Sequence, residues 1–362
     1  MSARPPSRDV LARLVASGTA RVALVLLVPL VFCALFGDLL ANDRPYTMTF
    51  KGERYYPAFR GMLVDLGFTR WPAPLVGMDF KDDAGPDAVF PPIPYRPSGI
   101  DLTNPLAPPS ADHLLGTDKL GRDILAGMIH GARISMTIGI VAVGIATIIG
   151  VFLGAVAGFF GGITDLAVNR LFEIMLAIPT FFLIITVSAF VAEPSIFYIM
   201  AVIGLTGWVG IARFTRNEFM TARTIEYVTA AEALGAHPLR IMFRHMLPNA
   251  MSPIIVAVVF GIAGAILVES GLSFLGIGVP ADVVTWGSIL NEARGHTFAW
   301  WLAVFPGCAI FATVLAYNLL GEALRDALDP KLKGRLPVGR RGFLRRLFRS
   351  ASGSAAGTAK RS

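Results

Sequence analysis

Long runs of apolar residues, separated by clusters of charged residues, dominate the pattern of this chain. A membrane-spanning helix requires about 20 consecutive apolar residues, and six runs approach or reach that length. They are residues 22–41, 134–160, 174–192, 195–212, 252–268 and 300–320. The pattern predicts an all-α integral membrane protein, a bundle of six transmembrane helices in which an extended external loop follows the first helix.

The composition agrees with a membrane protein and excludes an ordinary soluble domain. Of the 362 residues, 54% are hydrophobic and only 16% are charged, whereas globular proteins carry about 25% charged residues. The mean hydropathy is +0.62. Both cysteines, Cys33 and Cys308, lie in apolar runs, so a disulfide-stabilised scaffold is excluded as well.

The distribution of lysine and arginine predicts the orientation of the chain in the membrane. These residues accumulate on the cytoplasmic side of membrane proteins because they resist translocation. With the N-terminus inside, the cytoplasmic segments hold 21 of them and the opposite segments hold ten, nine of which lie in the loop 42–132. Long loops are translocated regardless of charge. Both termini are therefore expected to be cytoplasmic.

Charge and composition divide the chain into five parts. These are a cytoplasmic N-terminal segment at 1–21, the first transmembrane helix at 22–41, an external loop subdomain at 42–132, a five-helix core at 133–330 with a cytoplasmic loop at 213–250, and a cytoplasmic tail at 331–362. The loop subdomain is rich in proline and aromatic residues and is expected to rest on the membrane helices. The tail holds ten lysines and arginines and no acid, which favours the anionic inner leaflet over nucleic acid as its partner.

Small residues and prolines predict details of the helix packing. Gly150, Gly154 and Gly158 recur at every fourth position, which places them on one helix face and predicts the close approach of a neighbouring helix. Prolines interrupt three of the runs and predict kinks there. They are Pro29, Pro179 and Pro306.

A cytoplasmic loop between the fourth and fifth runs carries the strongest functional signal. Its first part, 226–235, contains small and helix-favouring residues and ends at Gly235, so it predicts a short helix. Small side chains on this helix would let it enter a cleft of a partner protein. Short connections to two spans would then transmit its movement into the membrane. Taken alone, the spacing favours a helix lying at the lipid surface, because such spacing is common.

This loop resembles the EAA loop of ATP-binding-cassette (ABC) importer permeases. The matching residues are Thr229, Ala230, Ala231, Gly235, Leu247 and Pro248. Further segments look like the second permease of the oligopeptide and dipeptide importers, and the resemblance extends over roughly residues 22–330. These segments are 115–118, 121–123, 131–135, 244–249 and 269–276. Several motifs in the right order are far more specific than any single motif.

The sequence departs from the family pattern in three places. Thr229 replaces the usual glutamate, which removes one acidic contact, and His245 replaces an aliphatic residue of the general pattern. The loop 42–132 is longer than in plain dipeptide permeases. In this respect the chain is similar to the branch that includes the microcin C importer permease.

The resemblance implies half of a transmembrane channel without catalytic or metal-binding residues of its own. ATP and Mg²⁺ would be used by one or two separate ABC ATPase subunits, which contact the coupling residues Thr229, Ala230, Ala231, Glu232, Gly235, Leu247 and Pro248. A second homologous permease chain would complete the channel, and an external peptide-binding protein would deliver the substrate. An external gate or binding-protein contact would involve Asp118, Arg122, Asp123 and Glu269. The expected location is the bacterial cytoplasmic membrane, as a multi-pass protein.

Other functional classes agree less well with the sequence. A membrane-embedded enzyme would need clustered histidine or acidic residues inside the spans, and a secondary transporter normally shows charged or broken helices near the midplane. A structural anchor would not explain the small-residue loop. Peptides are the expected cargo, and nickel is the alternative because related importers carry that metal.

Overall fold

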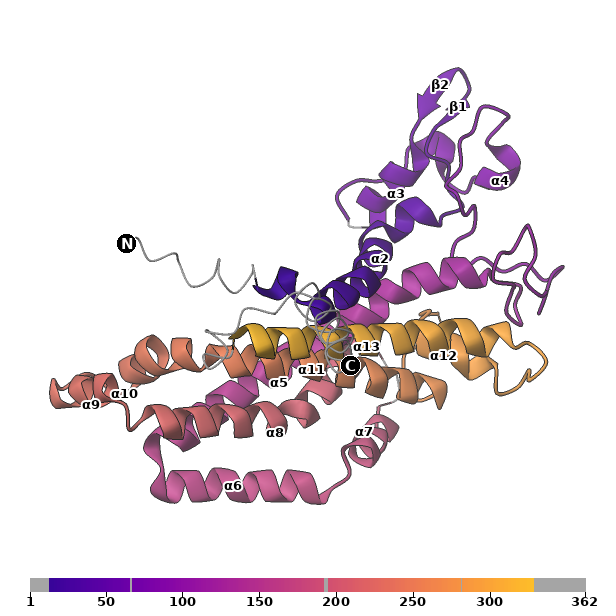
Figure 1. The fold of residues 1–362 in the computed structure, drawn as a ribbon. Helices are drawn as coiled ribbons and strands as arrows, with labels where there is room; N and C mark the ends of the chain where they lie inside the picture. The colour runs from indigo at the N-terminus through magenta and orange to yellow at the C-terminus, as the bar shows by residue number, and fades with distance from the viewer. Residues whose placement is uncertain (1–12, 66, 192–194, 281, 329–362) are drawn as a thin grey trace, which may run out of the picture.

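The fold is a bundle of long helices with a small subdomain attached at one end (Figure 1). The structure is a computed structural model that describes residues 13–65, 67–191, 195–280 and 282–328. Within these residues, the secondary structure is helical apart from one short hairpin. The fold is therefore the expected all-α membrane fold.

Five helices are long and apolar enough to cross a membrane. They are α2 (Gly18–Leu40), α5 (Ile124–Phe160), α8 (Ile196–Ala222), the segment Pro238–Phe274 and α13 (Trp301–Leu328). The segment Pro238–Phe274 joins α10 (Pro238–Arg240), a π-helix η2 (Ile241–Met246) and α11 (Leu247–Phe274). A sixth span is formed if α6 (Gly162–Ala177) and α7 (Thr180–Ala189), which meet at a bend of 79°, are taken together.

The bend between α6 and α7 corrects one predicted span. Residues 174–192 were expected to form a single helix, but α6 ends at Ala177 and α7 begins at Thr180. Ile178 is extended, with φ −98° and ψ 120°, because the ring of Pro179 disfavours a helical conformation of the preceding residue. The kink predicted at Pro179 is a complete break between two helices, and the span reaches back to Gly162.

Glycines hold α5 and α8 in direct backbone contact, as the sequence predicts. A Cβ atom at Gly150 would lie 2.8 Å from the carbonyl oxygen of Trp208, and one at Gly158 would lie 2.6 Å from the carbonyl oxygen of Arg216. Gly154, which lies one turn from each of these two glycines, approaches the backbone of α8 in the same way. These two helices form the centre of the bundle, and α11 packs on both.

An ion pair and two backbone contacts attach α2 to α5. The guanidinium of Arg133 donates from Nη2 to Asp38 Oδ2 at 2.8 Å and from Nε to the carbonyl oxygen of Ala34 at 2.8 Å. His130 Nε2 lies 2.8 Å from the carbonyl oxygen of Ala41. These polar residues interrupt the apolar run, which is why the sequence predicted a helix from residue 134 although α5 begins at Ile124.

The segment between α2 and α5 forms a small loop subdomain. It projects beyond the end of α2 (Figure 1). Its elements are β1 (Met48–Phe50), β2 (Glu53–Tyr55), α3 (Pro57–Asp65), the 3₁₀ helix η1 (Ala73–Leu75) and α4 (Phe80–Asp83). The strands pair antiparallel with Met48 opposite Tyr55. A small core of Met48, Leu75 and Ala84 stabilises it.

The bundle has two distinct ends. The α9 end carries α9 (Glu226–Ala233) and α10, and the α12 end carries α12 (Trp286–Glu292) together with the loop subdomain (Figure 1). At the α12 end, Trp301 Nε1 donates to the carbonyl oxygen of Thr117 at 2.9 Å, which fixes the last part of the loop subdomain on α13. The predicted coupling residues and the predicted gate residues therefore lie at opposite ends.

Candidate functional site: a helix at one end of the bundle and a pocket at the other

The short helix expected within residues 226–235 is present as α9, and buried side chains anchor it to the bundle. Val228 is completely buried and packs in the same apolar cluster as Ile241, Met242 and Met246 of the π-helix η2. Ala231 is half-buried against that cluster. The inner face of α9 is therefore held on the beginning of the long segment that continues into α11.

The end of α9 requires glycine because of the backbone conformation. Gly235 has φ +73°, the left-handed region that glycine adopts without a Cβ penalty. Its N–H donates to the carbonyl oxygen of Glu232 at 2.9 Å, and the N–H of Ala236 donates to that of Ala231 at 3.1 Å. This is the pattern of a Schellman helix end. A Cβ at Gly235 would meet nothing within 4 Å, so the dihedral angle alone imposes the requirement.

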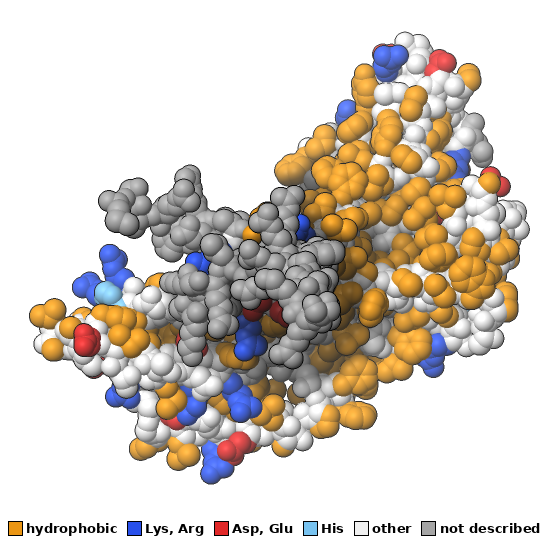
Figure 2. All heavy atoms as spheres, in the orientation of Figure 1, with side chains coloured by type: hydrophobic (Ala, Val, Ile, Leu, Met, Phe, Trp, Pro, Cys, Tyr) orange, Lys and Arg blue, Asp and Glu red, His pale blue; other side chains and the backbone are white. Residues whose placement is uncertain are grey.

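The outer face of α9 and its neighbours expose several large apolar side chains. The apolar tip is the set of exposed residues Ile225, Tyr227, Leu234, Leu239 and Phe243. Leu234 is 88% exposed, and Figure 2 shows apolar side chains gathered at this end of the molecule. Exposed patches of this kind mark interaction surfaces. The predicted coupling residues Thr229, Ala230 and Glu232 are also exposed here.

A hydrogen bond connects α9 to the first turn of α11. Asn249 Nδ2 donates to the hydroxyl of Tyr227 at 3.1 Å and to the carbonyl oxygen of His245 at 2.7 Å. Leu247 and Pro248 occupy the first turn of α11, directly after the π-helix η2. Since η2 runs into α11 without a loop, α9 is connected to the long helix through η2 and through this hydrogen bond.

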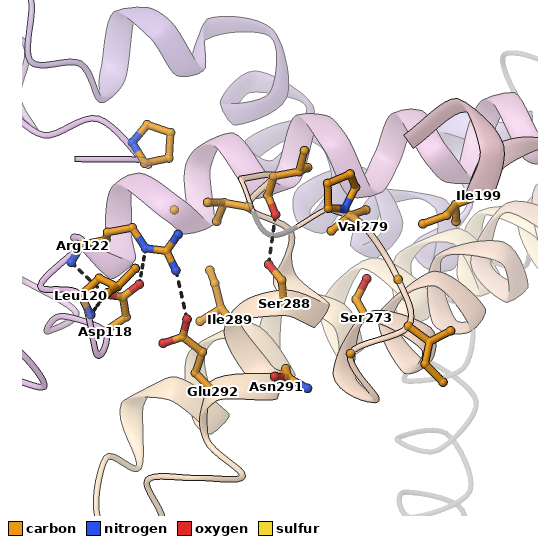
Figure 3. A pocket seen from close by; sticks show the side chains of 18 of the residues that line it. Asp118, Leu120, Arg122, Ile199, Ser273, Val279, Ser288, Ile289, Asn291 and Glu292 are labelled. Atoms are coloured by element: carbon orange, nitrogen blue, oxygen red, sulfur yellow. Dashed lines mark hydrogen bonds and ion pairs between the residues drawn. The ribbon is translucent and has the colours of Figure 1, made fainter. Parts of the chain in front are cut away.

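At the α12 end, an arginine joins two carboxylates from distant parts of the chain. Asp118 accepts hydrogen bonds from the backbone N–H groups of Leu120 and Arg122 at 2.8 and 2.9 Å. Arg122 Nε donates to Asp118 Oδ2 at 2.5 Å, and Nη2 donates to Glu292 Oε1 at 3.0 Å (Figure 3). The predicted gate residues Asp118 and Arg122 are thus brought together, and Arg122 ties the loop subdomain to α12.

Asp123 lies next to Arg122 in the chain but makes different contacts. Its Oδ1 accepts from the N–H of Ala126 at 2.7 Å and so caps α5, and its Oδ2 lies 2.9 Å from Nδ1 of His113. Asp123 and His113 are both buried. Its interactions are those of a helix cap that positions the start of α5.

Glu269 is buried inside the bundle rather than placed at the mouth of the α12 end. Its side chain is fully buried in α11, and Ser273 Oγ donates to its Oε1 at 2.8 Å. Ser270 Oγ lies 3.4 Å from its Oε2. The hydroxyl of Ser135, also fully buried, has no hydrogen-bond partner among the described residues. In this conformation the Glu269 side chain is not available for contact with an external protein.

Two of the cavities that the described residues line lie near the predicted gate and coupling residues. The first, here the outer-loop pocket, has a volume of about 540 Å³ at the α12 end, between α5, α8, α12 and the segment that connects α11 to α12 (Figure 3). The second has about 730 Å³ and lies toward the α9 end, lined by residues of α5, α8, α11 and α13. The described residues contain no group of three or more histidine, cysteine or acidic side chains arranged to hold a metal ion.

Glu292 is the residue of this region that sequence reasoning missed. Its side chain is 8% exposed and lines the outer-loop pocket. Burial raises the pKa of its carboxyl, and the negative charge of Asp118 raises it further, while Lys119 and Arg122 act in the opposite direction. No local motif marks this position, because its partner Arg122 is 170 residues away in the chain.

Comparisons with known proteins identify the family of this chain. Residues 150–334 match the family described as "Binding-protein-dependent transport system inner membrane component". The chain is 39% identical to the oligopeptide transport system permease protein OppC of Bacillus subtilis over 68% of its own length and 81% of the relative. It is 42% identical to the di/tripeptide transport system permease protein DppC of Pseudomonas aeruginosa over 68% of its length and 84% of the relative. The chain therefore belongs to the inner membrane components of binding-protein-dependent transport systems, as a permease subunit of a peptide ABC importer.

Proposed function

We propose that the chain forms one half of a peptide translocation pathway and that α9 docks into a groove of a cytosolic ABC ATPase. The supporting observation is the apolar tip, whose five large side chains are exposed while the opposite face of α9 is anchored through the buried Val228. Burial of such a patch against a partner is favourable because it removes apolar surface from water. The smaller exposed residues Thr229 and Ala230 let the α9 backbone approach the partner closely.

ATP hydrolysis would take place in the partner subunits, which would bind ATP and Mg²⁺. In this mechanism, closure of the ATPase dimer displaces α9. The displacement passes through Val228 and the Tyr227–Asn249 hydrogen bond to η2 and α11. Because α11 also lines the 730 Å³ cavity, its movement would open that cavity alternately to the two sides of the membrane.

The same proposal assigns the two ends of the bundle to the two sides of the bacterial cytoplasmic membrane. The α9 end would face the cytoplasm, in agreement with the excess of lysine and arginine in the predicted cytoplasmic segments. Both termini would then be cytoplasmic. An external peptide-binding protein would dock at the α12 end, where the Asp118–Arg122–Glu292 bridge would hold the outer gate. A second homologous permease would complete the pathway, with one or two ATPase subunits bound inside.

A charge placed in the apolar tip tests the docking proposal. The variant Leu234→Asp should reduce the amount of ATPase that co-purifies with the permease pair from mild detergent, by about tenfold, because an aspartate would have to be buried in an apolar groove. Leu114→Asp is the matched control, since Leu114 is also exposed but lies in the loop subdomain at the other end. Equal recovery of ATPase with both variants would refute docking through the tip.

A further inference from the structure

The outer-loop pocket contains a buried carboxylate that is only partly compensated by positive charge. Arg122 divides its hydrogen bonds between Asp118 and Glu292, so a single guanidinium serves two carboxylates. The only other cation within salt-bridge range of Glu292 among the described residues is Lys119, whose Nζ lies 3.8 Å away on a side chain that is 52% exposed. An exposed ammonium at that distance is well solvated and contributes little.

The protonation behaviour of Glu292 agrees with this imbalance. Its pKa is raised, first by burial and then by the neighbouring Asp118. Burial therefore opposes the charged form of Glu292, and Arg122 and Lys119 offset this only in part. A positively charged group that entered the pocket would stabilise the charged form further.

The remaining walls of the pocket have the mixed character that a peptide requires. Ile124, Ile199, Val279 and Ile289 provide apolar surface, and Ser288 and Asn291 add polar groups on the same helix as Glu292. Figure 3 shows Ile199, Val279, Ser288, Ile289 and Asn291 among the side chains that line this pocket together with Arg122 and Glu292. A volume of about 540 Å³ lies in the range of small-molecule pockets, about 300–1,000 Å³.

We propose that Glu292 binds the free α-ammonium group of an incoming peptide, with the first side chain of the peptide against the apolar wall of the outer-loop pocket. This inference rests on the proposed function, because it requires the α12 end to face the side from which peptide arrives. Among ligand groups, an ammonium fits better than a carboxylate, because Asp118 and Glu292 already engage Arg122 and would repel an anion. The permease would then select for an unblocked N-terminus independently of the external binding protein.

Equilibrium binding without the binding protein tests this assignment. The purified permease pair with its ATPases, in lipid nanodiscs, would be titrated with trialanine that carries a fluorophore on its C-terminal amide, and with the N-acetylated form of the same probe. Fluorescence anisotropy should show binding of the free form that is about tenfold tighter or more, as expected for a charge-assisted hydrogen bond. Failure of the wild-type complex to bind either probe, or equal binding of both, would overturn the assignment.

Three variants of the same complex attribute the preference to Glu292. Glu292→Gln should abolish the preference by weakening the binding of the probe with a free N-terminus alone. Arg122 would remain held by Asp118 in this variant. Lys119→Met should change the preference little, because the exposed Lys119 ammonium contributes little to Glu292. Asp112→Asn, which removes an exposed acid of the loop subdomain that does not line the pocket, should leave it unchanged. Equal weakening of both probes by Glu292→Gln would show a structural role instead.

The proposed function has its own readout. ATP-driven uptake of unlabelled trialanine into proteoliposomes, with the external binding protein present, tests import from the α12 side. Absence of uptake by the wild-type system would refute the proposed pathway. Normal uptake together with indifference to N-acetylation in the binding assay would refute only the role of Glu292.

Discussion

The carbonyl oxygen of Trp208 on α8 lies 2.8 Å from the position that a Cβ atom at Gly150 on α5 would occupy. The two backbones therefore touch at this level, and the contact recurs at Gly154 and Gly158 on the following turns. In lipid, helices associate through van der Waals packing of this kind, because apolar surface is no better buried in protein than in lipid tails.

A leucine at Gly150 should separate α5 from α8. We expect Gly150→Leu to destabilise the bundle by about 1–3 kcal/mol, the usual range for overpacking, and to lower the thermal unfolding temperature in detergent. Gly144→Leu is a closely matched control, since Gly144 lies on the same helix and a Cβ there would meet nothing within 4 Å. Equal loss of stability in both variants would contradict specific contact at Gly150.

Substitutions at Gly235 should follow backbone preference rather than side-chain size. The left-handed conformation costs a non-glycine residue about 1–2 kcal/mol, and asparagine tolerates it better than β-branched residues do. We therefore expect ATP-driven uptake to decline in the order glycine, asparagine, valine at this position, because the end of α9 unwinds progressively. The open space around Gly235 means that Gly235→Asn should retain substantial activity. Equal defects in the asparagine and valine variants would indicate a close contact with the partner instead.

Removal of the Glu269 side chain should destabilise the folded chain more than conversion of its carboxyl to an amide. Glu269→Ala leaves the hydroxyl of Ser273 without its acceptor in a fully buried site, a loss of about 1–3 kcal/mol for an unsatisfied polar group. Glu269→Gln keeps a carbonyl oxygen at the same reach. Thermal unfolding of the purified chain should rank the alanine variant below the glutamine variant, and the reverse order would refute the hydrogen-bond explanation.

The ion pair of Asp165 and Arg216 should behave as a coupled unit between α6 and α8. Arg216 Nη2 donates to Asp165 Oδ2 at 2.6 Å and its Nε contacts the other oxygen, so the pair is bidentate. We expect Asp165→Asn and Arg216→Gln each to lower the unfolding temperature. The double variant should be less destabilised than the sum of the two, by about 0.5–3 kcal/mol. Simple additivity of the two effects would show that the pair contributes no coupling.

Most of the fold could be predicted because each long helix coincides with an apolar run. The prediction was weaker where polar residues continue a helix, as at His130 and Arg133, whose partners on α2 are far away in the sequence. The bend at Pro179 was anticipated from its ring. The extension of that span back to Gly162 was not, because Asp165, Asn169 and Arg170 interrupt the apolar run.

The candidate site was predictable only where it depends on local chemistry. Gly235 predicts the end of α9, because glycine adopts the left-handed conformation of a helix end without a Cβ penalty. Glu292 could not be recognised, because its importance depends on Arg122 and on the pocket that the folded chain creates. The similarity of this chain to the branch that includes the microcin C importer permease stays a prediction, since the relatives compared above are named for dipeptides, tripeptides and oligopeptides.

If the apolar tip docks on an ATPase, it would also affect the fate of a subunit that is made without its partners. Leu234 and Phe243 would remain in contact with water in an orphan chain, and exposed apolar residues are the feature that chaperones and quality-control proteases recognise. Assembly with the ATPase would conceal that signal. The same few side chains would thus set the lifetime of unassembled copies and keep the number of permease chains matched to the supply of ATPase.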